Sequence, residues 1–232
     1  GADVTLAVKS VDLTPESAKI NVLFDSDEDG RVRDTLSYPT QFTGRADIGL
    51  NIVVMRTEYL KQIVLDAIAH NYTSLTSDIL ARNMQNRNYR VYKYDGYFAC
   101  ISSFADYYAH SMELLSDASA RDALFNVKDR PIYTKVRNSV PAFYAASSSV
   151  RNSMVADGCE IEGSVENSIL FRGVRIAPDA HVKNCIIMQD CHVEEGVQLE
   201  NCILDKQAVI KHDGKLIGPS AYPIVISKNM VI

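Results

Sequence analysis

The chain has 232 residues, of which 47% are hydrophobic and 23% charged, a composition typical of a globular protein with one large or two small domains. Its formal net charge of -5 and its pI near 5.5 argue against nucleic-acid binding, which requires a basic face. No apolar run reaches the roughly 18 residues of a membrane span, so we expect no membrane partner.

The cysteines indicate a reducing environment. There are 5 of them, an odd number, and no pair has C-x-x-C or zinc-site spacing. The first residues read as a strand and not as a secretory signal. We therefore expect free thiols in a cytoplasmic protein.

The first half of the chain alternates strand and helix patterns. Residues 2–8 and 18–24 predict strands, and the acidic turn "DSDEDGR" that follows has Gly30 as its expected pivot. The continuous apolar run at 48–55 predicts a strand covered on both faces. Thr57 is the expected N-cap of the next helix. The apolar face of that helix is predicted to comprise Leu60, Ile63, Val64, Ala67 and Ile68.

Further along, the same alternation continues. A second helix is predicted over residues 76–87, a strand over 89–98 and a helix over 103–116. This order predicts an α/β sheet. We expect that domain to occupy residues 1–118, with a linker at 119–146 and a second domain at 147–232.

From about Ser148 onward, apolar residues recur every five or six positions and not at helical spacing. Such hexapeptide repeats predict a left-handed parallel β-helix of about four coils, whose stacking buries a continuous core. The inward aliphatic series is Val150, Val155, Ile161, Val165, Leu170, Ile176, Val182, Ile187, Val193, Leu199, Leu204, Ile210 and Leu216.

Two positions before most of these aliphatic residues lies a small side chain. Cys159, Cys185, Cys191 and Cys202 occupy this small inward position, where a thiol acts as a compact hydrophobe. Only Cys100 falls outside the repeat.

A basic stretch joins the two halves. Pro131 and Pro141 flank Arg130, Lys135 and Arg137. The stretch is either a solvated linker or an anion-binding strip that would pair with the phosphates of a small effector.

Two segments of the repeat carry a family resemblance. "VRNSMVADGCEIEGSVENSILFRGVRI" and "VKNCIIMQDCHVEEGVQLENCILDKQAVI" resemble the C-terminal β-helix of the bacterial glucose-1-phosphate adenylyltransferase family. The strand and helix order before them resembles the sugar-phosphate half of that family's catalytic domain. The resemblance implies a partial nucleotidyltransferase α/β sheet followed by the β-helix. It also implies a role in converting ATP and glucose 1-phosphate to ADP-glucose and pyrophosphate.

The resemblance places the family's glycine-rich nucleotide loop before the first residue of this chain. No G-x-G-x-x-G or G-x-x-x-x-G-K-[ST] pattern occurs in the sequence itself. We therefore expect no ATP or other cofactor to be bound by this chain, and assign Mg²⁺ and ATP to a catalytic partner.

Two family motifs that fall within the chain are altered. Active members have Glu-Lys-Pro where this chain has Ser37, Tyr38 and Pro39, so the lysine that holds the sugar phosphate is absent. Active members have Gly-Tyr-Trp-x-Asp-Val-Gly-Thr where this chain reads "GYFACISS", which places Cys100 at the Mg²⁺-binding aspartate. A largely protonated thiol is a poor ligand for a hard cation. The resemblance thus implies a remnant sugar-phosphate pocket of Ser37, Tyr38, Asp47 and Cys100, without catalytic or metal-binding residues.

These departures resemble the non-catalytic regulatory subunit of the family, which assembles with the catalytic subunit into a heterotetramer for glycogen biosynthesis. Two alternatives remain open. The first is an active nucleotidyltransferase in which Asp34, Asp47 or Asp95 replaces the lost ligand. The second is a β-helix acyltransferase with His181 or His192 as its base, although both histidines are expected to face outward.

Overall fold

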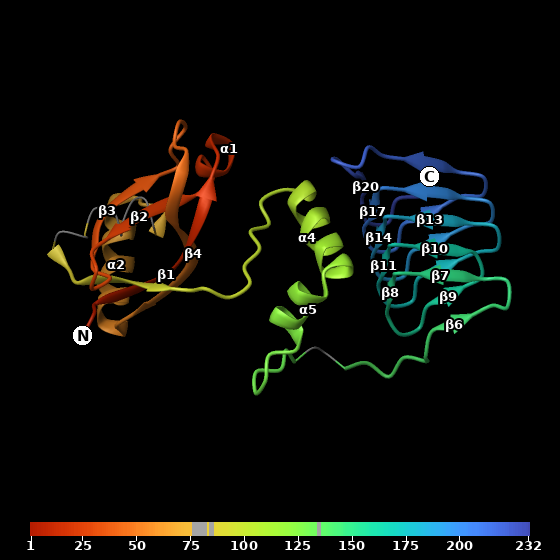
Figure 1. The fold of residues 1–232 in the computed structure, drawn as a ribbon, viewed down its shortest axis with the longest axis horizontal. Helices are drawn as coiled ribbons and strands as arrows, with labels where there is room; N and C mark the ends of the chain where they lie inside the picture. Colours follow the sequence, from red (N-terminus) through yellow and green to blue (C-terminus); the bar gives the residue numbers. More distant parts are fainter. Residues whose placement is uncertain (76–82, 84–85, 134–135) are drawn as a thin grey trace. The chain divides into compact units, whose positions relative to one another are not determined.

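The computed structural model describes residues 1–75, 83, 86–133 and 136–232 (Figure 1). These residues form two compact units, Gly1–Gly96 and Tyr97–Ile232. The division differs from the boundary that we expected after residue 118. Most of the second helix predicted from the sequence, at 76–87, lies outside the described residues.

The first unit contains a mixed five-stranded sheet with the order β3-β2-β4-β1-β5. β1 runs antiparallel to β4 and parallel to β5. Alternating residues of β1 are buried in one cluster with side chains of helix α2. The elements are β1 (Val4–Leu13), α1 (Pro15–Ala18), β2 (Val22–Ser26), β3 (Val32–Ser37), β4 (Gly44–Met55), α2 (Thr57–His70) and β5 (Tyr89–Lys93).

The turn between β2 and β3 confirms the expected pivot. Gly30 has a φ of 77°, a left-handed conformation that glycine adopts without steric cost. The expectation that β4 is covered on both faces is wrong for this unit. Ile48 is buried, but Ile52 and Val54 are 61% and 68% exposed.

Helix α2 buries only part of the predicted face: Ile63 and Ala67 pack in the core of this unit. Tyr59 and Ile63 are buried, and the Tyr59 hydroxyl lies 2.7 Å from that of Tyr89 on β5. The N-cap is Arg56, which makes no side-chain capping bond, so Thr57 is the first helical residue and not the cap. The other three residues of the predicted face are exposed: Leu60, Val64 and Ile68.

The second unit contains the predicted parallel β-helix. Its three faces are five-stranded parallel sheets with the orders β7-β10-β13-β16-β19, β8-β11-β14-β17-β20 and β6-β9-β12-β15-β18 (Figure 1). The strands are β6 (Phe143–Tyr144), β7 (Ser149–Arg151), β8 (Met154–Val155), β9 (Glu160–Ile161), β10 (Ser164–Glu166), β11 (Ile169–Leu170), β12 (Arg175–Ile176), β13 (His181–Lys183), β14 (Ile186–Ile187), β15 (His192–Val193), β16 (Gln198–Glu200), β17 (Cys202–Leu204), β18 (Val209–Ile210), β19 (Lys215–Ile217) and β20 (Ile224–Ile226).

The interior of the β-helix confirms the repeat pattern. The predicted inward aliphatics from Ile161 to Ile210 are buried in one continuous cluster, with Val150, Val155 and Leu216 packed against its ends. The four cysteines of the repeat are also buried there, each at most 1% exposed: Cys159, Cys185, Cys191 and Cys202.

One corner of the β-helix is built from stacked asparagines. Asn152, Asn167, Asn184 and Asn201 have φ values of 42°, 47°, 50° and 52°, in the left-handed region that asparagine tolerates. The side-chain amides of the first three donate to the side-chain carbonyl in the next coil, at 2.9, 2.7 and 3.2 Å, and the Asn201 amide donates to the Gly218 backbone carbonyl at 2.8 Å. These bonds hold consecutive coils in register.

Helix α4 (Phe104–Ser116) packs on the β-helix face formed by β8, β11, β14, β17 and β20. Its Tyr108 is buried in a cluster with Ile186 and Ile203, which explains why α4 belongs to the second unit. Helix α5 (Ala118–Phe125) follows within the segment that we expected to be a linker. Among the described residues, no helix is both long and apolar enough to cross a membrane.

Candidate functional site

A polar cavity of the first unit has a volume of about 500 Å³ and lies along its sheet strands. Side chains from all five strands line it, among them Ser10 in the carboxyl-terminal half of β1 and Lys93 at the carboxyl end of the parallel strand β5. Ligands of open α/β sheets bind preferentially at such strand ends. The polar lining residues are Ser10, Asp25, Asp34, Arg45, Asp47 and Lys93.

Asp47 is the most constrained polar residue of this cavity. It lies directly opposite Ser10 in the β1–β4 ladder, and the Ser10 hydroxyl donates to its carboxylate. The Lys93 Nζ lies 3.1 Å from the other carboxylate oxygen, and the Asp47 side chain is only 12% exposed. The three strands β1, β4 and β5 therefore meet in one hydrogen-bonded ion pair, in which Asp47 is enclosed and the Lys93 side chain is 57% exposed.

A second pair of acids lines the same cavity. Asp25 and Asp34 are direct cross-strand partners in the β2–β3 ladder. Like charges in this position destabilise a sheet, and a bound ligand that donates hydrogen bonds would relieve the repulsion. The cavity is therefore suited to a hydroxyl-rich molecule. Among the described residues, no group of three or more His, Cys, Asp or Glu side chains could hold a metal ion.

Sequence reasoning missed Ser10, Asp25 and Lys93. Lys93 ends β5, and Ser10 lies near the carboxyl end of β1; in both strands the preceding inward residues are apolar, such as Val8 and Val91. That switch from apolar to polar at a strand end is a signal that the sequence carries. Their meeting with Asp47 depends on the pairing of β1 with β4 and β5, which the sequence alone does not specify.

The structure places Ser37 and Tyr38 away from the lining of this cavity. Ser37 ends β3, and Tyr38 follows with a φ of 54° and donates its backbone N–H to the Asn21 carbonyl at 2.9 Å. The Tyr38 ring is half exposed and lines a separate hollow of about 60 Å³. Of the predicted remnant pocket in this unit, only Asp47 lines the larger cavity.

Cys100 belongs to the second unit and has an exposed thiol. The polar residues after it cap helix α4. The Ser103 hydroxyl accepts from the Asp106 N–H at 3.1 Å, and the Asp106 carboxylate accepts from the Ser102 hydroxyl at 2.6 Å. Hydrogen bonds from Ser102 and Ser103 lower the pKa of Asp106 below its ordinary value. Asp95, the other candidate acid, is exposed at the end of the first unit.

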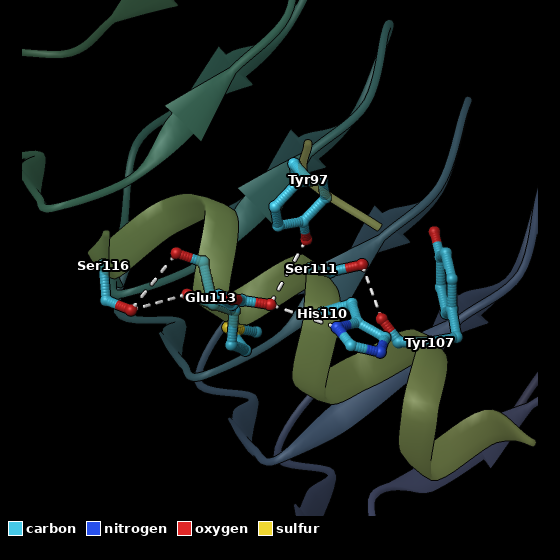
Figure 2. Close-up of polar contacts among 7 residues, drawn as sticks. Tyr97, Tyr107, His110, Ser111, Glu113 and Ser116 are labelled. Atoms are coloured by element: carbon cyan, nitrogen blue, oxygen red, sulfur yellow. Dashed lines mark hydrogen bonds and ion pairs between the residues drawn. The ribbon is translucent and has the colours of Figure 1, made fainter. Parts of the chain in front are cut away.

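Figure 2 shows how the segment after Gly96 is tied to α4. The Tyr97 hydroxyl donates to Glu113 Oε2 at 3.2 Å, and His110 Nδ1 lies 3.1 Å from the same oxygen. Partial burial and the Glu113 carboxylate raise the pKa of Tyr97. The Ser111 hydroxyl donates a hydrogen bond to the backbone carbonyl of Tyr107 in the same helix. We read this network as an anchor for the segment that contains Cys100.

The basic stretch gives no assembled anion site among the described residues. Arg130 and Arg137 are both exposed, and neither forms an ion pair there. Lys135 lies outside the described residues. The stretch therefore remains a prediction from the sequence.

The two repeat histidines face outward, as expected. His181 on β13 and His192 on β15 are both exposed. The His181 Nδ1 lies 2.6 Å from the Ser164 hydroxyl in the preceding coil. Neither imidazole has a carboxylate partner within 4.0 Å among the described residues.

Comparison with known proteins supports this description. A model of the GlmU-like C-terminal hexapeptide family matches residues 140–221, which is the β-helix. The "Glycogen biosynthesis protein GlgD" of Bacillus subtilis is 37% identical over 182 residues, or 78% of this chain and 52% of the relative. The protein of the same name from Geobacillus stearothermophilus is 50% identical over 72 residues, or 31% of this chain and 20% of the relative.

Enzymes are similar to the chain as well. The "Glucose-1-phosphate adenylyltransferase" of Acetivibrio thermocellus is 26% identical over 216 residues, or 90% of this chain and 49% of the relative. The chain thus spans about half the length, or less, of these curated relatives. These matches confirm the resemblance predicted from the sequence, to the glucose-1-phosphate adenylyltransferase family and, within it, to the glycogen biosynthesis protein GlgD.

Proposed function

We propose that this chain is part of a regulatory, non-catalytic subunit of glucose-1-phosphate adenylyltransferase. It would act in the cytoplasm in glycogen biosynthesis by assembling with the catalytic subunit. The observation that carries the proposal is the arrangement of charged side chains in the polar cavity. Its one lysine, Lys93, is paired with Asp47, and Tyr38, which stands where the family has its phosphate-binding lysine, lines a different hollow.

The charge balance of the cavity favours this reading. A sugar phosphate needs a free cation, because charge-assisted hydrogen bonds to phosphate are among the strongest in such sites. The cavity offers three carboxylates, Asp25, Asp34 and Asp47, against Arg45 and the paired Lys93. It can accept hydrogen bonds from sugar hydroxyls, and Arg45, which forms no ion pair among the described residues, is the one cation left to meet a phosphate against this excess of negative charge. In the proposed assembly, Mg²⁺ and ATP are bound by the catalytic partner, and the basic stretch would take a phosphorylated effector.

The alternative is an active nucleotidyltransferase with altered residues. The meeting of Asp34 with Asp25 and Asp47 at one cavity is the observation that favours it. Carboxylates are the ligands that Mg²⁺ prefers. Because these three do not form a metal site by themselves, the ion would have to arrive bound to the substrate. The two functions differ in whether the protein turns over substrate by itself.

The test measures ADP-glucose formation by the whole protein alone, by a catalytic glucose-1-phosphate adenylyltransferase alone, and by the two mixed. We expect no turnover by the protein alone and a higher rate, or a changed effector response, in the mixture. Asp34→Asn should leave that stimulation unchanged, as should the control Asp29→Asn in the nearby exposed turn. Turnover by the protein alone that Asp34→Asn abolishes and Asp29→Asn preserves would establish the alternative.

A further inference from the structure

The outward face of the sheet β7-β10-β13-β16-β19, called the β13 face below, carries two columns of side chains along the β-helix. Parallel pairing in register places each side chain directly above its counterpart in the preceding coil. One column is polar: Ser149, Ser164, His181, Gln198 and Lys215. The other alternates in charge over four coils: Arg151, Glu166, Lys183 and Glu200, followed by Ile217.

The charges of the second column have no partners among the described residues. Neighbouring coils are only about 4.8 Å apart, yet Arg151, Glu166, Lys183 and Glu200 form no ion pair within 4.0 Å in the part of the chain that is described. The next face of the β-helix behaves differently. There, charges in adjacent coils pair, as Arg175 does with Glu160 at 3.4 Å.

The other two faces have their own partners. Helix α4 covers the face that contains β14 and β17, and ion pairs between coils satisfy charges on the face that contains β12. The β13 face also has a shallow hollow of about 310 Å³ between its charged side chains, over the small residues Ser149 and Ser164. A long side chain from an opposing surface would fit into this hollow.

The alternation of charge is complementary to itself in one orientation. If two copies meet face to face across a two-fold axis that runs along the strands between β10 and β13, their coils run in opposite order. Glu166 then opposes Lys183 of the other copy, and Arg151 opposes Glu200. The symmetry repeats both pairs, which gives four ion pairs between the copies. An arrangement with the coils in the same order would oppose like charges at every level.

We propose that the β13 face is a docking surface for a second copy of this chain, in the antiparallel arrangement just described. In the same arrangement His181 opposes Ser164 of the other copy. Exposed ion pairs are individually weak and are screened by salt, so the association is weak and sensitive to ionic strength. It does not require the catalytic partner of the proposed function and can be tested without it.

The test uses sedimentation equilibrium of the whole chain at low salt, with the variants Glu166→Lys and Lys183→Glu. Each variant by itself opposes like charges at two symmetric places, so we expect its self-association constant to fall at least tenfold. In an equimolar mixture, the lysine introduced by the first variant faces the glutamate introduced by the second, and the native Lys183 of the first faces the native Glu166 of the second. The mixture should therefore associate about as well as the wild type.

Two further measurements complete the test. Raising the salt from about 0.05 to 0.5 M should weaken wild-type association, because the Debye length shortens severalfold. The control Glu160→Lys reverses a charge on the neighbouring face and should leave association unchanged. The proposal is overturned by a monomeric wild type at all concentrations, by single variants that associate like the wild type, or by a mixture that stays monomeric.

Discussion

Gly163 lies on the inside of the β-helix, where the chain turns between β9 and β10. A Cβ atom added there would collide with the carbonyl oxygen of Ala180 and would lie 2.7 Å from that of Ala177, both in the next coil. Real Cβ contacts are almost never this short, and backbone atoms of a stacked coil cannot move aside independently. The small inward position of the hexapeptide repeat is therefore set by the spacing of coils as well as by hydrophobic packing.

At this residue we predict that Gly163→Ala lowers the free energy of unfolding by about 1–3 kcal/mol, the usual cost of overpacking. Urea unfolding followed by circular dichroism would measure the change. The control is Glu162→Ala at the adjacent exposed position, which should change the midpoint little. Equal midpoints for both variants would show that the coils separate easily at this point.

Helix α4 is attached to the β-helix through Tyr108. Its hydroxyl donates to the Asn184 backbone carbonyl at 2.8 Å and reaches Asn201 Oδ1 at 3.3 Å, so it joins the helix to the asparagine stack. Asn201 is one of the two buried polar residues in the described part of the chain. Removing a partner from a buried polar group costs more than the bond itself contributes.

For this element we predict that Tyr108→Phe destabilises the second unit by about 1 kcal/mol, because it deletes these bonds while keeping the ring. Thermal or urea unfolding would measure it. Tyr144→Phe, at an exposed residue of β6, is the matched control and should be neutral. A neutral Tyr108→Phe would mean that apolar contacts alone hold α4 in place.

The Tyr108→Phe variant should also change how the stability of the fold depends on pH. Burial raises the pKa of Tyr108 to about 12. An unfolded tyrosine ionises near pH ~10, so between roughly pH 10 and 12 the unfolded chain loses a proton that the folded chain keeps. Stability from this group is thus fully present below pH ~10 and is lost as the pH rises through the folded pKa. Tyr108→Phe should make the alkaline loss of stability less steep.

At the scale of the whole molecule, each of the three buried clusters described above lies within one of the two units. The core of the first unit lies entirely within residues 4–91, and the clusters of the β-helix and of α4 lie entirely within residues 107–226. Each unit therefore has its own core, which is the physical criterion of a domain.

We predict that residues 97–232 fold by themselves, whereas residues 119–232 do not remain monomeric and stable. The shorter fragment lacks α4 and exposes Ile186, Ile203 and Val225, which α4 covers. Size-exclusion chromatography and thermal unfolding of the two fragments would measure the difference. Equal stability of the two fragments would place the domain boundary after residue 118, where the sequence suggested it. It would also mean that α4 does not contribute to the stability of the β-helix.

The sequence by itself determined the β-helix almost completely. Its repeat is local, because each inward residue lies at a fixed offset from the previous one, and every coil pairs with its neighbour in sequence. The positions of the buried cysteines and the outward direction of His181 and His192 followed from the same periodicity. The alternation of strand and helix likewise predicted an α/β sheet in the first unit.

Only the tertiary structure decided which face of α2 is buried and how the polar cavity is assembled. The buried face of α2 was set by contact between Tyr59 and Tyr89, and the helical spacing could not distinguish it from the neighbouring face with Leu60 and Val64. The polar cavity depends on Ser10, Asp47 and Lys93, which are far apart in sequence and meet only through the β1, β4 and β5 pairings. Such long-range pairing is chosen by the whole core and not by any local pattern.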